Sequence, residues 1–283
     1  MITSLTDVTT CIDWLSVTRA NNKYPENYPT NKQELKRGML GYDTAIKYID
    51  GRVELCSSTR KDMGVHTIFS GDTLRNLMWM ANVDSFQVLT DMASKRVSRV
   101  DVALDIKWGT LDILALWSML ESDQVDTRIE KWLYLRGAKG DGETLYIGAP
   151  KSDKRMRIYD KQAESGSDYE WTRVEVQYRH KMATRACRAL LSSKTPSEQV
   201  PGMIVDFINF DNDRDWVTVM GSEMVKMAKP EITVTNREKW LLETAASALA
   251  SEMIEGQSGS SIMQRFIQAT NLFYDRKQQK YKP

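Results

Sequence analysis

The segment RMRIYDK, residues 155–161, holds the most distinctive group of reactive side chains in the chain. Strand alternation would place Arg155, Arg157, Tyr159 and Lys161 on one face. Phenolate is the form of tyrosine that attacks phosphorus, and nearby cations favour it over the neutral phenol. The same cations bind a phosphate under attack. The pattern predicts phosphoryl transfer to Tyr159, with an ordinary strand tyrosine among exposed basic neighbours as the alternative.

Three carboxylates occupy central positions of two other strand-like segments. Asp101 and Asp105 alternate with apolar residues in VSRVDVALDIKW, and Glu175 does so in WTRVEVQYR. If the two strands are neighbours with matching faces, the three acids can converge on one divalent cation that orients a phosphate. A water-facing sheet surface with cross-strand ion pairs is the alternative. The chain has only two histidines and three isolated cysteines, so we expect oxygen ligands and therefore Mg²⁺ or Mn²⁺.

The motifs of several other enzyme classes are missing from the sequence. It contains no GxxxxGK[ST] P-loop, no GxGxxG that opens a helix after a strand, and no GxSxG. Intrinsic ATPase activity, dinucleotide binding and serine hydrolysis are therefore not indicated. The odd number of isolated cysteines favours free thiols and a reducing compartment over a disulfide framework.

The composition is that of an ordinary globular chain. Of the 283 residues 41% are hydrophobic and 27% charged, and the net charge is +1. The charge is uneven, because residues 151–188 contain ten Lys or Arg and six Asp or Glu, a local net charge of +4. A local basic surface can bind phosphates even when the total charge is near zero. With no long apolar run and no signal-like N-terminus, we expect a cytoplasmic protein of a bacterial cell without membrane contact.

The elements that must position these residues are strands first and helices afterwards. We expect strands at CIDWLSVT, VHTIFS, VSRVDVALDIKW, TLYIG, KRMRIYDK and WTRVEVQYR, and a hairpin that turns at Asp50-Gly51. Helices are expected at SGDTLRNLMWMA, VDSFQVLTDMAS and 111–121, and throughout the chain after Lys181. This order predicts an α+β fold with an antiparallel sheet. We expect a nicking domain at 1–193 and a helical region at 194–283.

Taken in order, these segments resemble a known family. SRVDVALDI, ETLYIGAPKSDKRMRIYDKQAE and WTRVEVQYRH are similar to blocks of the replication initiators of small staphylococcal rolling-circle plasmids, which also occur in filamentous phages. The resemblance is close over residues 97–181. The opening IDWLSVT resembles the first strand of the phage-type members. The implied fold is an antiparallel sheet with flanking helices, similar to that of the histidine-using relaxases.

The resemblance implies a role for individual residues. Tyr159 lies where the family has the tyrosine that nicks one strand at a double-strand origin, forms a 5′-phosphotyrosyl link and later rejoins the strand. Arg157 and Lys161 would contact the scissile phosphate. Asp101, Asp105 and Glu175 match acidic positions that are thought to hold the metal, and Glu164 matches a further acidic position as a weaker metal or base candidate. The remaining cations of these strands are expected to bind DNA: Lys154, Arg155, Arg173 and Arg179.

The resemblance also implies partners. Origin DNA with an unpaired nick region is the substrate, and a host polymerase extends the 3′-hydroxyl. In the plasmid proteins the C-terminal part selects the origin and binds a helicase, a role that residues 230–283 would take here. A homodimer is left open as one source of the second strand transfer. Two alternatives remain, namely a regulator that binds an origin or promoter without catalysis, and a nuclease that uses water instead of Tyr159.

Overall fold

The structure is a computed structural model of the whole chain, which consists of two compact units. The first unit is Met1–Ala228 and the second is Lys229–Pro283. The residues that the structure describes are 2, 6–20, 23–57, 59–92, 96–138, 141–221, 264 and 268. The predicted roles of residues 230–283 in origin selection and helicase binding lie outside the described residues, apart from the helical positions 264 and 268.

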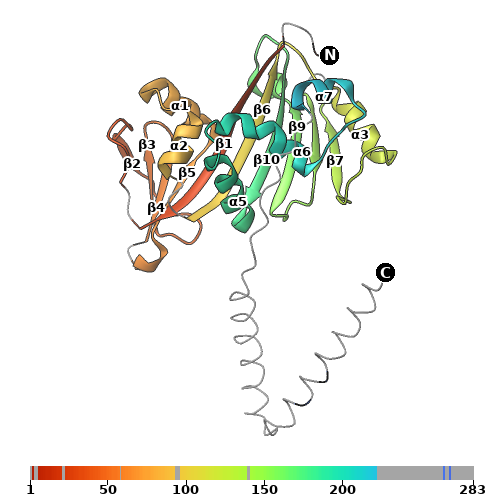
Figure 1. The fold of residues 1–283 in the computed structure, drawn as a ribbon. Helices are drawn as coiled ribbons and strands as arrows, with labels where there is room; N and C mark the ends of the chain where they lie inside the picture. Colours follow the sequence, from red (N-terminus) through yellow and green to blue (C-terminus); the bar gives the residue numbers. More distant parts are fainter. Residues whose placement is uncertain are drawn as a thin grey trace. The chain divides into compact units, whose positions relative to one another are not determined.

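A single antiparallel sheet forms the centre of the first unit (Figure 1). Its ten strands run in the order β2-β3-β4-β5-β1-β6-β10-β9-β8-β7. The long strands β1, β6 and β10 lie at the middle. The strands are β1 (Asp7–Arg19), β2 (Lys32–Glu34), β3 (Thr44–Tyr48), β4 (Val53–Cys56), β5 (Val65–Phe69), β6 (Arg96–Lys107), β7 (Trp132–Arg136), β8 (Glu143–Ile147), β9 (Lys154–Asp160) and β10 (Trp171–Arg179).

Alternating residues give β6 two chemically different faces. Val100, Val102, Leu104 and Ile106 are fully buried in the core, as the sequence pattern predicts. The residues between them face the other side of the sheet. The pairing of β6 with β10 continues without a register shift along its whole length. One face of the central sheet therefore carries the apolar core and the other carries the polar residues of interest.

Helices cover the apolar face at the centre of the sheet. In Figure 1, α5 and α6 cross β6 and β10, which they contact. Helices α1 and α2 pack against β1. The helices are α1 (Gly71–Ala81), α2 (Ser85–Met92), α3 (Ile113–Glu121), α4 (Lys161–Ser165), α5 (His180–Leu191), α6 (Gln199–Phe207) and α7 (Arg214–Met220), with short 3₁₀ turns at Lys61–Met63 and Pro196–Glu198. The α+β class predicted from the sequence is confirmed.

Two short strands were not predicted from the sequence. β2 is an edge strand of three exposed residues, and no alternation can be read over so short a run. β7 is the other edge strand, and its residues are half-buried or exposed. Among the predicted elements, the hairpin that turns at Asp50-Gly51 is present as β3 and β4.

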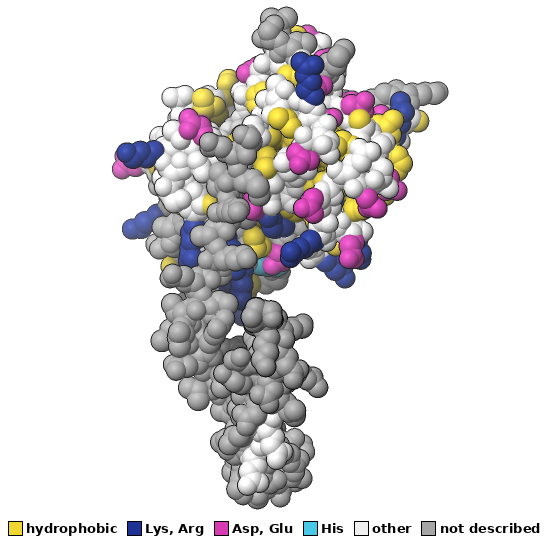
Figure 2. Space-filling view, turned by 45° about the vertical axis from the view of Figure 1, so that its right-hand side comes forward, with side chains coloured by type: hydrophobic (Ala, Val, Ile, Leu, Met, Phe, Trp, Pro, Cys, Tyr) yellow, Lys and Arg dark blue, Asp and Glu magenta, His cyan; other side chains and the backbone are white. Residues whose placement is uncertain are grey.

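The surface of this unit is mixed in charge. On the face shown in Figure 2, acidic, basic and hydrophobic side chains are interspersed, in keeping with the net charge of +1. Within the described residues no helix is long and apolar enough to cross a membrane.

The first unit ends later than the sequence suggested. Its boundary follows Ala228, whereas we expected one after residue 193. The reason is that α6 and α7 belong to the core of the first unit. Phe210 and Trp216 are fully buried, with ring centroids 4.9 Å apart in an edge-to-face contact. A helix-only stretch of sequence does not by itself mark a separate domain.

Trp216→Ala is expected to destabilise the first unit by about 3–5 kcal/mol, because it empties a large core site. The indole also loses its 3.0 Å hydrogen bond from Nε1 to Asn209 Oδ1. Urea denaturation of the full chain would measure the change. Val217→Ala is the control, since this neighbouring side chain is 40% exposed. It should change the stability by less than about 0.5 kcal/mol. Equal effects of the two substitutions would show that α7 is not part of the core.

Candidate active site

Strand register brings the predicted reactive residues onto one polar face. β9 pairs with β10 so that Tyr159 lies opposite Arg173 and Arg157 lies opposite Glu175. On the other side of β10, Gln177 is paired with Asp101 of β6. These pairs are cross-strand neighbours, whose side chains on one face lie close together. The condition set for the acids of β6 and β10 is therefore met, since the two strands are neighbours, and β9 adjoins β10 on its other side.

A β-bulge in β1 adds an acid that the sequence analysis missed. The register between β1 and β6 shifts between Ile12 and Trp14, which leaves Asp13 as an extra residue. A bulge turns two consecutive side chains toward one side of a sheet. Accordingly Asp13 and Trp14 both line the same cavity as Asp101. Alternation in IDWLSVT would have put Asp13 and Trp14 on opposite faces, and no turn residue marks the bulge.

The polar face contains a cavity of about 680 Å³. Strands β1, β6, β9 and β10 supply its floor, while α1 and α4 supply its rim. It is large enough for a nucleotide phosphate and its neighbouring groups. The residues that line it include Asp13, Trp14, Arg75, Arg99, Asp101, Arg157, Tyr159, Lys161, Glu164, Trp171 and Glu175.

Tyr159 is the buried centre of this cavity. Its side chain is only 3% exposed, and its hydroxyl has no hydrogen-bond partner among the described residues. The Arg157 guanidinium carbon lies 4.0 Å from the ring centroid, and Lys161 Nζ lies 5.6 Å from it. Burial raises the pKa of Tyr159, and this outweighs the opposing effect of Arg173 and Arg157. In the absence of DNA and a metal ion, the neighbouring cations alone therefore do not lower the pKa of Tyr159 below its ordinary value.

Asp101 and Glu175 are buried carboxyls, each held by one arginine. Arg99 Nε donates to Asp101 Oδ1 at 2.9 Å, and Arg157 Nη2 donates to Glu175 Oε2 at 2.8 Å. Burial raises the pKa of both groups, against the attraction of their arginines. The pKa of Glu175 reaches about 7, and the nearby charges of Asp101 and Asp13 raise it further. A bound cation would reduce the repulsion between these neighbouring carboxylates.

Asp105, the third predicted metal ligand, lies elsewhere. Along a strand, four residues span about 13 Å, so Asp101 and Asp105 are too far apart to share one ion. Asp105 accepts hydrogen bonds from Arg173 Nε and Nη2 and from Trp171 Nε1, each of 2.7 Å. It is 5% exposed. Its role is to hold Arg173 in place, and the structure does not bring it together with Asp101 and Glu175.

No ready-made metal centre is found in the part of the chain that the structure describes. There, no three His, Cys, Asp or Glu side chains are grouped as ligands. Asp72 and Glu164 line the Tyr159 cavity from its rim helices, and Asp13, Asp101 and Glu175 line it from the strands of its floor. Their oxygen atoms are the ligand type that Mg²⁺ and Mn²⁺ prefer, and they would have to leave their arginines to bind an ion.

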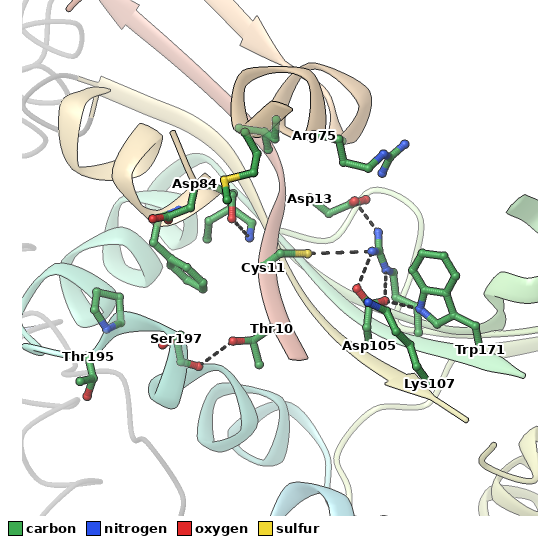
Figure 3. Close-up of a pocket in the computed structure, with 18 of the residues that line it drawn as sticks. Thr10, Cys11, Asp13, Arg75, Asp84, Asp105, Lys107, Trp171, Thr195 and Ser197 are labelled. Carbon is green, nitrogen blue, oxygen red and sulfur yellow. Dashed lines mark hydrogen bonds and ion pairs between the residues drawn. The ribbon is translucent and has the colours of Figure 1, made fainter. Parts of the chain in front are cut away.

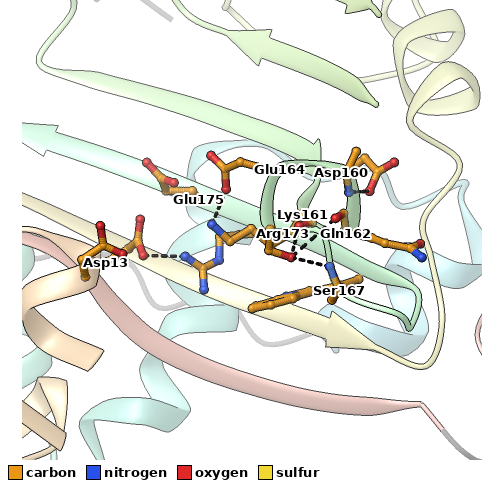
Figure 4. Close-up of polar contacts among 12 residues, drawn as sticks. Asp13, Asp160, Lys161, Gln162, Glu164, Ser167, Arg173 and Glu175 are labelled. Carbon is orange, nitrogen blue, oxygen red and sulfur yellow. Dashed lines mark hydrogen bonds and ion pairs between the residues drawn. The ribbon is translucent and has the colours of Figure 1, made fainter. Parts of the chain in front are cut away.

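Lys161 reaches the cavity from a helix and not from a strand. β9 ends at Asp160, whose side chain accepts a 2.9 Å hydrogen bond from the amide of Ala163 and caps α4. Strand alternation therefore does not apply to Lys161. Its ammonium group nevertheless lines the cavity and forms an ion pair with Glu164 of the same helix. Glu164 also lies 4.0 Å from Arg157, and these cations lower its pKa despite partial burial. Figure 4 shows these polar contacts.

Two of the predicted DNA-binding cations have internal partners instead. Lys154 lies on the helix-covered face, where Nζ forms a 3.2 Å ion pair with Asp206. Arg173 is 3% exposed and binds Asp105 and Asp13. Figure 3 shows Asp13 and Asp105, the two carboxylates that bind Arg173. Neither cation is placed to bind a strand of DNA at the surface.

The other two predicted DNA-binding cations, Arg155 and Arg179, lie beside the Tyr159 cavity. Arg155 stacks on Tyr146, with its guanidinium carbon 4.3 Å from the ring centroid. Arg179 donates a 3.0 Å hydrogen bond from Nη1 to the carbonyl of Pro150. Both line a smaller cavity of about 240 Å³ together with Arg99 and Arg157. This neighbouring cavity is the more basic of the two.

A glycine at the start of α1 allows Asp13 to take its position. A Cβ atom at Gly71 would lie 2.7 Å from Asp13 Oδ1 and 3.3 Å from the Asp13 carbonyl oxygen. We expect Gly71→Ala to displace this carboxylate from Arg173 and to cost about 1–3 kcal/mol in stability. Thermal denaturation would measure it. Gly166→Ala is the control for a glycine with open space around it, although its φ of +70° adds a backbone cost of about 1 kcal/mol. A Gly71 variant as stable as the natural chain would contradict this close contact.

Comparison with known proteins agrees with the geometry. The family model described as replication initiation factor matches residues 95–267, more than half of the chain. No curated protein gives a significant match. A solved structure of a rolling circle replication initiator protein from Geobacillus stearothermophilus has the same fold, with a TM-score of 0.64 and 22% sequence identity over 79% of this chain and 100% of that one. The match over the strands that carry Tyr159, Asp101 and Glu175 shows that this chain belongs to the replication initiation factor family.

Proposed function

We propose that this protein starts rolling-circle replication by nicking one DNA strand at an origin, with Tyr159 as the nucleophile. The observation that carries the proposal is the buried Tyr159 hydroxyl. It has no hydrogen-bond partner among the described residues, and the cations Arg157 and Lys161 lie beside its ring in the same cavity. A buried hydroxyl without a partner is costly in a folded protein, so its presence calls for a functional reason. Membership in the replication initiation factor family supports this reading.

The chemical step is an in-line displacement at phosphorus. The Tyr159 oxygen forms a bond to the scissile phosphorus, and the bond from phosphorus to the 3′-oxygen breaks. The leaving 3′-oxygen takes up a proton from water, so the products are a 5′-phosphotyrosyl link and a 3′-hydroxyl, which is the primer that a host polymerase would extend. Later attack by a 3′-hydroxyl on the phosphotyrosine reverses the step and rejoins a strand. A dimer partner, water or Tyr159 itself are the open routes for that second transfer.

The side chains around Tyr159 supply charge and a proton acceptor. Arg157 and Lys161 would bind the non-bridging oxygens of the phosphate and stabilise the charge that develops on them. A phosphate that enters the cavity also draws Arg157 away from Glu175. Glu164 is kept ionised by Lys161 and Arg157, and it lines the same cavity, so it is the proposed acceptor of the Tyr159 proton.

We expect Mg²⁺ or Mn²⁺ as the cofactor, held by carboxylates. Asp13, Asp101 and Glu175 are the three that line the Tyr159 cavity from the strands of its floor, and Asp13 replaces Asp105 in the set predicted from the sequence. When bound, the ion would neutralise and orient the scissile phosphate. The pKa values of Asp101 and Glu175 are raised by burial and by neighbouring carboxylates, and a bound cation would offset this unfavourable negative charge.

A direct test is to look for protein attached to a DNA end. Purified protein is incubated with Mg²⁺ or Mn²⁺ and supercoiled DNA that carries the cognate origin, and the products are denatured. We expect nicked circles with protein bound covalently at the 5′ end and a free 3′-hydroxyl. Omitting the metal or adding a chelator should prevent nicking.

The two other readings give different products. Nicked DNA with a free 5′-phosphate and no attached protein would indicate a nuclease that uses water. Specific binding to the cognate origin without any nicking would indicate a regulator. Either result would overturn Tyr159 as the nucleophile. Helicase recruitment and dimer formation are further expectations of the proposed function, and pull-down and light-scattering measurements on the full chain would test them.

A further inference from the structure

Three aromatic rings form a continuous stack next to the Tyr159 cavity. The rings of Trp108 and Tyr169 have centroids 4.8 Å apart, and those of Tyr169 and Trp171 are 5.8 Å apart with an angle of 21° between their planes. Trp108 follows directly after β6, and Trp171 begins β10. We call these three residues the aromatic stack. Stacked aromatic side chains are the platforms on which proteins bind unpaired bases.

Trp108 is the outer ring of the stack and is unusually placed. It is 55% exposed, although a tryptophan ring is the most costly side chain to leave in water. Its φ angle is +58°, in the left-handed region that a bulky residue rarely adopts. The backbone is held there by a 2.9 Å hydrogen bond from the Trp108 amide to the Glu170 carbonyl and by a bridge between Gly109 and Trp171. Backbone strain of this kind is typical of ligand-binding positions.

The inner ring of the stack connects it to the chemistry. Trp171 lines the Tyr159 cavity and also a second cavity of about 680 Å³ on the other side of Asp13. Lys107 Nζ and Lys161 Nζ lie 5.4 Å and 5.8 Å from the Trp171 ring centroid. A chain of bases on the stack would thus have its phosphates beside lysines, one of which also belongs to the active cavity. Figure 3 shows Trp171 beside Lys107 and Asp105.

The second cavity has the mixed character that an unpaired nucleotide needs. Its walls include the apolar side chains of Leu74, Met78 and Phe86. Arg75, Lys107 and Lys194 line it as well, in addition to the internally paired Arg173. Apolar walls suit the flat face of a base, and the cations suit its phosphate. Arg75 and Asp13 line both cavities, so the two are neighbours. A double helix offers no free base face for such a surface, whereas single-stranded DNA does.

We propose that the aromatic stack guides single-stranded DNA to Tyr159, with Trp108 stacking on an unpaired base next to the scissile phosphate. That the bound strand is guided to Tyr159 rests on the proposed nicking function. The stacking itself can be tested without nicking, because it concerns binding of the unpaired strand alone. The occupant is single-stranded DNA because the platform is continuous, through Trp171 and Lys161, with the cavity that holds the nucleophile.

The test compares two exposed tryptophans in a chain that cannot form the covalent link. In Tyr159→Phe protein, Trp108→Ala is set beside Trp79→Ala, whose ring lies on α1 and is 82% exposed. Fluorescence anisotropy measures the affinity for a labelled single strand of mixed sequence of about 16 nucleotides, the upper end of known single-strand sites, and for the same sequence as a duplex. Trp108→Phe tests whether an aromatic ring suffices. Thermal denaturation checks that each variant is folded.

We expect Trp108→Ala to weaken single-strand binding roughly 5- to 150-fold, the range for loss of one stacked base. Trp79→Ala should change it less than about twofold, and Trp108→Phe should recover most of the loss. Because the phosphate contacts remain, the salt dependence of single-strand binding should keep its slope. Duplex affinity should be unchanged.

Two results would contradict the proposal that Trp108 stacks on an unpaired base. The first is equal single-strand affinity of the Trp108→Ala and Trp79→Ala proteins. The second is a loss by Trp108→Ala that is as large for the duplex as for the single strand. Neither result depends on whether a covalent link forms in the natural protein. Failure of the adduct test with a positive result here would leave a single-strand-binding protein and remove only the nicking function.

Discussion

Tyr159→Phe is expected to abolish the covalent protein–DNA product and to lower the rate of nicking by about 10⁴-fold or more, the scale of loss when a nucleophile is removed. Phenylalanine keeps the ring that packs against Arg157 and removes only the oxygen that attacks phosphorus. That oxygen has no partner among the described residues, so its loss breaks no hydrogen bond. The variant should therefore be as stable as the natural chain, or slightly more so. Denaturing gels of the products and thermal denaturation would measure the two effects.

Tyr146→Phe provides the matched control. Tyr146 lies on β8, where it is the strand partner of Arg157, and it stacks against Arg155. It is thus a second tyrosine next to the same cations, but it does not line the Tyr159 cavity. We expect the Tyr146 variant to form the covalent product at a rate close to that of the natural chain. If the Tyr146 variant lost the covalent product and Tyr159→Phe still formed it, the nucleophile would be Tyr146 and not Tyr159.

Much of the active face followed from alternation in three strands. The apolar residues of β6 fixed which side of the strand is buried, and so placed Asp101 on the opposite side. The same reasoning placed Arg157 and Tyr159 on the polar side of β9, and Glu175 on that of β10. Alternation does not determine strand order, and the structure alone shows that β6, β10 and β9 are neighbours.

The set of acids could be predicted only in part. Alternation gives the face of a residue but does not show how far apart two residues of that face lie. Asp101 and Asp105 share a face, yet the rise of a strand separates them by about 13 Å. The bulge in β1 acts in the opposite way, because it turns Asp13 toward the cavity against the alternation of its neighbours. Bulges depend on pairing with another strand, and the sequence of β1 alone does not reveal them.

Local charge was a poor guide to which cations are available for DNA. The basic stretch at 151–188 has a net charge of +4, but part of its positive charge is used inside the protein. Lys154 is paired with Asp206, which lies outside that stretch, and Arg173 is paired with Asp13 and Asp105, which do as well. A sum over a sequence window cannot include partners that only the fold supplies. Arg157 and Lys161 line the cavity, where an incoming phosphate can reach them.

Arg173→Met is expected to destabilise the protein strongly. Arg173 donates two hydrogen bonds of 2.7 Å to Asp105 and one of 2.5 Å to Asp13. Methionine fills much of the volume but leaves both carboxylates without their cation in a buried site. Breaking a buried ion pair by removing one partner typically costs about 3–5 kcal/mol. Urea denaturation of the full chain would measure it, with Arg179→Met at the other end of β10 expected to change stability by about 0.5 kcal/mol or less.

The double variant Arg173→Met with Asp105→Asn identifies the cause of that loss. If the cost comes from the unpaired Asp105 carboxylate, a neutral amide at that position should recover part of it, with a coupling of about 1 kcal/mol or more between the two sites. If Asp105 were instead a metal ligand, Asp105→Asn alone would weaken Mn²⁺ binding and leave apo-protein stability unchanged. If Arg173 were a DNA contact, Arg173→Met would weaken DNA binding at unchanged stability. The buried geometry of Arg173 predicts the first of these three outcomes, because its donors are already used within the sheet that holds Tyr159.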